Sequence, residues 1–252
     1  YLPFLRASDV DAGYVQSMCR GLAKHTRHRF GNLNQDESWN PIRPLPSQKF
    51  LRRSLIQMVE TYSELWEDEH ALKRVLKAAS ETVEYQKHAS RLIVWIFQVL
   101  NNDSKYSRTI DSEQSARRDA LNHPHGVAAE SAVILWQQMH SVEESQPELM
   151  VPLLERCSRH PNPAVRTAIL HRLPYLVQES SDLGWHLFDL IVDGAPGFLW
   201  PIAEQTLYHN YYDDFDRVEH YLNRIENEAL DDAGETYGRI MTLSHLADHI
   251  SQ

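Results

Sequence analysis

The feature that most restricts the fold of this chain is a pattern of helical segments that recurs along its second half. His123-Pro124 precedes the Ala-rich segment AAESAVILWQQM, and His160-Pro161 precedes AVRTAILHRLPYL 37 residues later. A third and fainter copy begins at Gly194 and continues as FLWPIAEQTLYHNYY. A recurrence of this length is typical of stacked supersecondary units, in which each unit needs its neighbours to bury its apolar faces.

Between these copies lie segments that we expect to form the second helix of each pair, namely residues 147–160, 181–193 and 214–228. Within them, a 34-residue spacing relates the apolar pairs Leu153-Leu154, Leu187-Phe188 and Tyr221-Leu222. Asp182 and Asp214 stand where an N-cap carboxylate would accept free backbone N–H groups. With a closing helix at about 235–250, residues 121–252 are predicted to form stacked helical hairpins.

The first half, residues 1–120, shows helical periodicity without a clear repeat. Apolar residues recur at spacings of three and four within residues 51–66, 72–83 and 92–100, which predicts amphipathic helices. The stretch 31–47 contains three prolines and no period, so we expect a loop there. Strand-like alternation is almost absent and the chain has only nine glycines. The sequence therefore predicts an all-α protein with a less regular N-terminal half.

The segment HPNPAVRTAILHRLPYL, followed by a second helix that ends in an Asp-Gly-x-Pro turn, resembles a HEAT repeat. The matching motif residues are Asn162, Val165 and Arg166. The resemblance implies an α-solenoid in which Val165 is buried and Arg166 pairs with a carboxylate, either Asp193 or Asp182. The first copy departs from the motif, because Glu130 replaces the arginine. The resemblance covers about residues 120–212 and implies an architecture rather than an activity.

A second resemblance concerns the context of the repeats. The segment ALNHPHGVAAESAVILW, followed by a HEAT-like array, is similar to C-terminal helical sensor regions of large bacterial defence proteins. In those proteins the helical region regulates an N-terminal NTPase or NAD-consuming domain.

The chain begins at Tyr1, without Met or a signal peptide, so we expect it to be a piece of a longer protein. Cys19 and Cys157 fit a reducing compartment, which predicts a cytoplasmic location and two buried, small apolar side chains.

Charge divides unevenly along the chain, whose formal net charge is -10. Residues 1–126 hold 18 Lys+Arg and 15 Asp+Glu, whereas residues 127–252 hold 7 and 20. A basic cluster in the first half comprises Arg20, Lys24, Arg27, Arg29, Arg52 and Arg53. Such a cluster can bind nucleic-acid phosphates or an acidic surface. The alternatives are an ordinary basic helix face and a contact with a further domain.

The second half offers an acidic and aromatic group as the candidate partner-binding patch: Tyr211, Asp213, Asp214, Phe215 and Asp216. Tyrosine provides a large rigid contact with a polar tip, and carboxylates favour a positively charged ligand. Trp200, Tyr208 and Tyr212 share one helical stripe, so we expect them in the core between repeats, with Tyr211 and Phe215 exposed.

His245 and His249 share a helix face, but the sequence between them lacks a zinc signature, so no metal or cofactor is expected.

Several functions are disfavoured by the sequence. No apolar run approaches the roughly 18–20 residues that cross a bilayer, so no membrane partner is expected. Gly-rich phosphate loops, a GxSxG elbow and reactive-cysteine contexts are all missing. No motif of an enzyme on a helical scaffold, such as a base-excision glycosylase, can be matched residue by residue to this sequence. We therefore expect a non-catalytic interaction or sensor module that binds a protein partner or an adjoining domain of the same chain. The alternative is a nucleic-acid-binding helical-repeat protein that uses the basic cluster.

Overall fold

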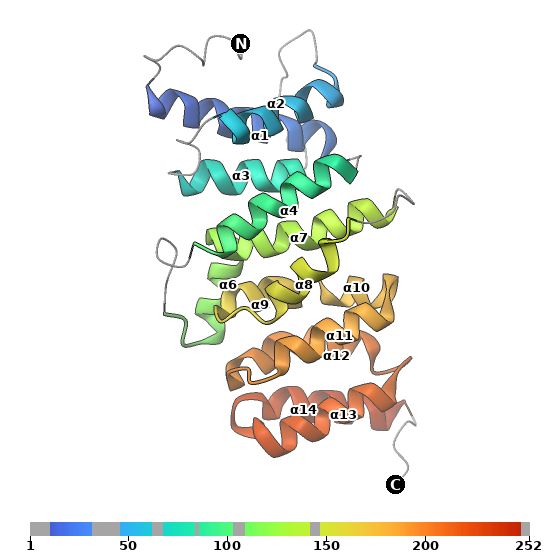
Figure 1. The fold of residues 1–252 in the computed structure, drawn as a ribbon. Helices are drawn as coiled ribbons and strands as arrows, with labels where there is room; N and C mark the ends of the chain where they lie inside the picture. The colour runs from blue at the N-terminus through green and yellow to red at the C-terminus, as the bar shows by residue number, and fades with distance from the viewer. Residues whose placement is uncertain are drawn as a thin grey trace. The chain divides into compact units, whose positions relative to one another are not determined.

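The computed structural model describes residues 11–31, 46–61, 68–83, 86–102, 109–141 and 147–247. Across these ranges all regular secondary structure is helical and no strand occurs (Figure 1), which confirms the all-α prediction. No helix in the same ranges combines the length and apolarity needed to cross a membrane. The chain divides into two compact units. The first comprises Tyr1–Ser107 and Asn122–Leu153, and the second comprises Arg108–Leu121 and Leu154–Gln252.

The first unit packs its helices around one central element. Its helices are α1 (Ala12–Phe30), α2 (Gln48–Thr61), α3 (Glu69–Ser80), α4 (Gln86–Leu100) and α7 (Pro124–Ser141). Helix α3 contacts each of the other four. The apolar stripes predicted within α2, α3 and α4 are buried, although Val94 leaves one side of α4 exposed. Tyr62, Leu65 and Trp66 lie outside the described residues, as does the Pro-rich stretch from 32 to 45.

Polar side chains fix the beginnings of two helices in this unit. The carboxylate of Asp11 accepts hydrogen bonds from the backbone N–H groups of Gly13 and Tyr14, which begins α1. Asp68 begins α3 in the same way. These caps satisfy backbone donors that no helical carbonyl reaches. Glu130, on α7, pairs with Lys77 of α3 at 2.5 Å, so this carboxylate joins two helices of the core.

The second unit contains the more regular part of the chain. Its helices are α6 (Glu113–Asn122), α9 (Pro163–Leu170), α10 (Leu173–Glu179), α11 (Ser181–Val192), α12 (Trp200–Asn210), α13 (Phe215–Glu228) and α14 (Leu230–Leu246). Helix α8 (Met150–Ser158) spans the change from one unit to the other, and a short 3-10 helix (Gly197–Leu199) precedes α12. Within the unit, α11 contacts α10 and α9, and α14 contacts both α12 and α13.

The 34-residue spacing has a direct structural counterpart. All six residues of the pairs Leu153-Leu154, Leu187-Phe188 and Tyr221-Leu222 are at most 4% exposed. They lie on α8, α11 and α13, the predicted second helices. Each of these three helices therefore buries the apolar pair that the spacing relates.

Helix boundaries differ from the expectation in three places. The helix predicted over AVRTAILHRLPYL, residues 164–176, breaks after Leu170, because Pro174 cannot continue an unbroken hydrogen-bonding pattern, and it resumes as α10. Ser180, rather than Asp182, is the N-cap of α11, and Asp214 begins α13 without a capping hydrogen bond from its side chain. Helix α14 begins at Leu230 but is kinked at Ala233, whose backbone is not helical, so its regular part begins close to the predicted start at about 235.

Candidate binding site

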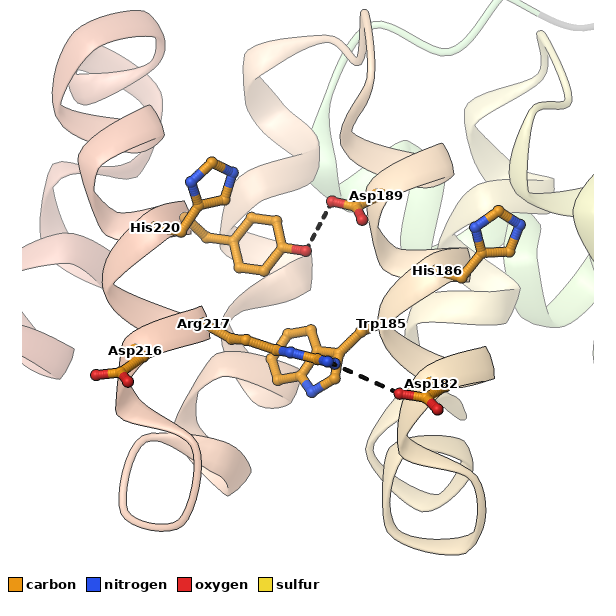
Figure 2. Close-up of a pocket in the computed structure, with 8 residues that line it drawn as sticks. Asp182, Trp185, His186, Asp189, Asp216, Arg217 and His220 are labelled. Atoms are coloured by element: carbon orange, nitrogen blue, oxygen red, sulfur yellow. Dashed lines mark hydrogen bonds and ion pairs between the residues drawn. The ribbon is translucent and has the colours of Figure 1, made fainter.

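Helices α11 and α13 enclose a surface hollow of about 490 Å³ (Figure 2). Its lining consists of Asp182, Trp185, His186, Asp189, Asp216, Arg217, His220 and Tyr221. Two pairs of these residues, Asp182 with Asp216 and His186 with His220, are related by the same 34-residue spacing as the buried pairs. The hollow is therefore formed in part by polar residues of α11 and α13 that share the 34-residue spacing.

The base of the hollow is a rigid group of aromatic rings. Trp185 and Tyr221 stack with ring centroids 5.5 Å apart and an interplanar angle of 15°. Phe188 meets the Tyr221 ring edge-on at 4.5 Å, and Trp200 lies 6.4 Å from Phe188. All four residues are buried. Aromatic pairs in these geometries add to the stabilisation from buried area, so the base holds α11 and α13 at a fixed separation.

A hydrogen bond crosses the hollow from one helix to the other. The Tyr221 hydroxyl donates to Oδ1 of Asp189 at 2.7 Å (Figure 2). Burial raises the pKa of Tyr221, and the hydrogen bond to Asp189 and the charge of that carboxylate raise the pKa further. The phenol therefore stays protonated and holds Asp189 in place, while the other carboxylate oxygen remains available as an acceptor.

The guanidinium of Arg217 lies within the hollow and bridges two carboxylates. Its Nη2 is 3.7 Å from Asp182 and its Nε is 3.7 Å from Asp214. The side chain of Asp182 is fully exposed and that of Arg217 is 44% exposed. Long ion pairs between exposed groups contribute at most about 1 kcal/mol, so this arrangement is easily rearranged.

Trp185, which lines the hollow, has a buried hydrogen-bond donor without a partner. The residue is 3% exposed, and its indole Nε1 is buried without a hydrogen-bond partner. Figure 2 shows Trp185 and Arg217 extending from α11 and α13 toward one another. A buried indole N–H ordinarily finds an acceptor, and no protein group of the described residues accepts from this one.

The predicted partner-binding residues divide between the hollow and its surroundings. Asp216 lines the hollow, and Asp214 contacts it through Arg217. Asp213 is exposed outside the lining, and Tyr211 and Phe215 are half-buried outside it. Sequence reasoning missed the central members of the lining, which are Trp185, Asp189 and Tyr221. The recurrence of Asp and His at a spacing of 34 is the signal that identifies the two helices in advance.

The expectation for the aromatic stripe was wrong for two of its three members. Trp200 is buried, but Tyr208 is 46% exposed and Tyr212 is 64% exposed. Helix α12 ends at Asn210, so Tyr212 lies beyond the helix and the stripe does not continue to it. Tyr208 instead borders a second hollow of about 410 Å³, which also has Arg117 and Arg239 in its lining.

Two arginines of the basic cluster are neutralised by carboxylates of the same unit. Arg20 pairs with Asp68 at 3.0 Å. Arg27 donates to both oxygens of Glu81 at 2.8 Å, and the Glu81 side chain is 1% exposed. A bidentate pair with a buried carboxylate is a strong structural contact, so these guanidinium groups join α1 to the start and end of α3.

The remaining residues of the basic cluster do not form one surface. Arg52 was predicted to contact phosphate, but it is 1% exposed, because it lies on the face of α2 that packs into the unit. Arg29 is half-buried, with its guanidinium 4.9 Å from the ring centroid of Phe30. Of the six basic residues that the sequence groups together, Lys24 and Arg53 are the two that are exposed.

Arg166 of the HEAT-like motif contacts main-chain carbonyls. Its Nε donates to the carbonyl of His160 at 2.8 Å, and its Nη1 donates to that of Ile191 at 3.2 Å. Burial lowers the pKa of Arg166, while the nearby charge of Asp193 raises it. Of the two carboxylates considered from the sequence, Asp193 therefore acts on Arg166, and Asp182 pairs with Arg217 instead.

Among the described residues, no group of three His, Cys, Asp or Glu side chains is arranged to hold a metal ion. His245 is exposed near the end of α14, and His249 lies outside the described residues. Cys19 and Cys157 are buried, as predicted. Burial raises the pKa of the Cys19 thiol to about 11 and that of Cys157 to about 12, so neither is an activated nucleophile.

Comparison with known proteins found no matching family model, no matching curated protein and no matching solved structure.

Proposed function

We propose that this chain is a non-catalytic helical-repeat interaction module that binds a segment of a protein partner in the hollow between α11 and α13. The observation that carries the proposal is the composition of that hollow. A rigid aromatic base, exposed carboxylates and an unused indole donor lie together on two consecutive helices. Rigid aromatic groups beside a few oriented polar groups are typical of surfaces that bind peptides.

The proposal includes a HEAT-like α-solenoid architecture for the repetitive part of the chain. Its support is the 34-residue spacing, which relates both the buried pairs on α8, α11 and α13 and the polar residues that line the hollow. Repeats of this kind use a surface formed by equivalent helices for binding. The partner is another protein or an adjoining domain of the same chain, as in a sensor region of a larger protein.

Nucleic-acid binding is the alternative, and the geometry favours it less. Arg20 and Arg27 are already paired with Asp68 and Glu81, and Arg52 is buried. A protein that neutralises several phosphates needs several exposed cations that lie together. A smaller hollow of about 230 Å³ has Arg53 in its lining, together with Glu60 and Arg91.

Selection from a phage-displayed library of random 12-residue peptides tests the proposal on the full chain. The test variant is D182K/D216K, which reverses two exposed charges in the hollow, and the control E179K/D231K makes the same charge change at exposed positions outside the lining. We expect peptides that bind the wild type and E179K/D231K but not D182K/D216K. An absence of enriched peptides, or binding that is indifferent to the hollow, would overturn the proposal.

A parallel measurement separates the alternative. Fluorescence anisotropy with labelled single-stranded and double-stranded DNA and RNA is recorded at increasing salt. Affinity that falls steeply with salt and weakens in K24A/R53A would support nucleic-acid binding. We expect no such binding, because these two cations are the exposed remainder of the basic cluster.

A further inference from the structure

We propose that the hollow between α11 and α13 receives an arginine side chain of the partner segment, and that Arg217 occupies this place when no partner is bound. The inference rests on the proposed function and specifies the partner's chemistry. It depends on three separate observations: the charge of the lining, the free indole donor and the position of the chain's own guanidinium.

The lining favours a cation. It contains three carboxylates, Asp182, Asp189 and Asp216, against the single guanidinium of Arg217, so its formal charge is -2 with neutral histidines. Asp189 is held by Tyr221 at one oxygen only. A second positive group therefore finds both an attractive potential and a free acceptor.

The indole donor favours a peptide over a free cation. Nε1 of Trp185 donates and cannot accept, so a cation alone leaves it without a partner. A peptide carries main-chain carbonyl groups next to its side chains. An arginine-bearing segment thus brings a guanidinium for the carboxylates and a carbonyl for the indole N–H, and both groups lie within one residue of each other along the chain.

The position of Arg217 favours arginine over lysine. The chain itself places a guanidinium between carboxylates here, which shows that the space accepts that planar group. A guanidinium presents five donors in a fixed fork, whereas an ammonium is a compact point charge with a strong hydration shell. Because both ion pairs of Arg217 are 3.7 Å long and exposed, displacing this side chain costs little.

NMR titration of the full chain with N-acetyl-arginine N-methylamide tests the inference, with the lysine analogue and guanidinium chloride as comparison ligands. The readout is the indole N–H signal of Trp185, assigned with the variant W185F, together with the backbone amides of α11 and α13. We expect the arginine compound to shift the indole signal and to bind at least about threefold more tightly than the lysine compound. Guanidinium chloride should shift amides of the hollow without shifting the indole signal.

Two substitutions should change the affinity for the arginine compound in opposite directions. Asp189→Asn keeps an oxygen for the Tyr221 hydroxyl but removes the charge, and we expect about fivefold weaker binding. Arg217→Gln removes the internal occupant, and we expect about threefold tighter binding. Arg239→Gln, on α14 and outside the lining, removes an equally exposed arginine and should change nothing.

Three outcomes would overturn the inference: equal binding of the lysine compound, unchanged or weaker binding by R217Q, or an unmoved Trp185 indole signal at saturation. Hollow-dependent peptides from the phage selection that lack arginine would overturn this inference alone. If the selection yields no hollow-dependent peptide and the arginine compound shifts no signal, the proposed function fails together with it.

Discussion

The basic and the acidic region of this chain both stand out in the sequence as charged clusters, and they differ in what their charges contact. In α1, Arg20 and Arg27 meet the carboxylates of Asp68 and Glu81, whose side chains are 11% and 1% exposed. Between α11 and α13, Asp182 is fully exposed and its ion pair with Arg217 is 3.7 Å long. A charge whose partner is buried thus holds helices together, whereas a charge whose partner is exposed remains available to a ligand.

The two regions should therefore respond differently to substitution. Removing a charge in α1 or α3 leaves a partner buried and costs stability, whereas removing one in the hollow changes binding and leaves stability nearly unchanged. The aromatic base beneath the hollow is buried, so we expect substitutions there to cost stability.

The largest expected effect comes from that aromatic base. Phe188→Ala removes a fully buried ring that contacts the rings of Trp185, Trp200 and Tyr221. We expect a loss of about 4 kcal/mol in the free energy of unfolding, measured by urea denaturation. Tyr175→Ala, which truncates a side chain that is 52% exposed, should change stability by less than about 0.5 kcal/mol. Comparable losses in both variants would refute a buried role for Phe188.

The buried ion pair of the first unit should give the next largest effect. Glu81→Gln leaves the Arg27 guanidinium without its bidentate carboxylate, and we expect a loss of about 3 kcal/mol. The matched control is Glu60→Gln, because Glu60 pairs with Arg91 where both side chains are more than 40% exposed. That change should cost less than about 1 kcal/mol. Equal midpoints of chemical denaturation for the two variants would contradict the distinction between buried and exposed pairs.

A smaller effect should follow from the close contact between α10 and α11, next to the hollow. A Cβ atom at Gly184 would lie 2.7 Å from the Cα of Val177 and 2.8 Å from its backbone nitrogen. Gly184→Ala should therefore force the helices apart and cost about 2 kcal/mol. Gly238→Ala, on α14, meets nothing within 4 Å and should gain up to about 1 kcal/mol from helix propensity. Thermal unfolding measures both variants, and a stabilised Gly184→Ala variant would show that α10 and α11 do not pack this closely.

The smallest effect should be the dependence of stability on alkaline pH. Burial raises the pKa of Cys19 to about 11 and of Cys157 to about 12 from an ordinary value of 9.0. The unfolded chain therefore loses these protons first, so the thiols lower stability as the pH rises through about 9. The decline in urea midpoint between pH 8 and pH 9 should be shallower in C19A/C157A than in the wild type. Identical declines would show that neither thiol is buried as described.

Much of the fold was predictable because burial leaves a periodic mark on the sequence. The stripes that include Leu72 and Val75 on α3, and Leu92 and Ile96 on α4, are fully buried as their spacing predicts. Helix ends were less predictable. The break after Leu170 and the kink of α14 at Ala233 depend on local proline geometry and on packing that no apolar period records.

The candidate site was only partly predictable, because composition does not show which side chains face one another. Asp216 was identified from its acidic neighbourhood, but Asp189 and Trp185 needed the packing of α11 against α13 to be recognised. Arg52 shows the opposite case, in which the sequence predicts a binding residue that the fold buries. It belongs to a basic cluster in sequence, yet its position on the inner face of α2 buries it.

Hydrogen–deuterium exchange of the full chain, with and without a peptide obtained from the phage selection, tests the central claim most directly. The account predicts slower exchange in residues 182–189 and 216–221 on peptide binding, and no change in α1 or α2. Protection in α1 and α2 with no change at α11 and α13 would contradict it, and would place the binding surface in the basic half of the chain.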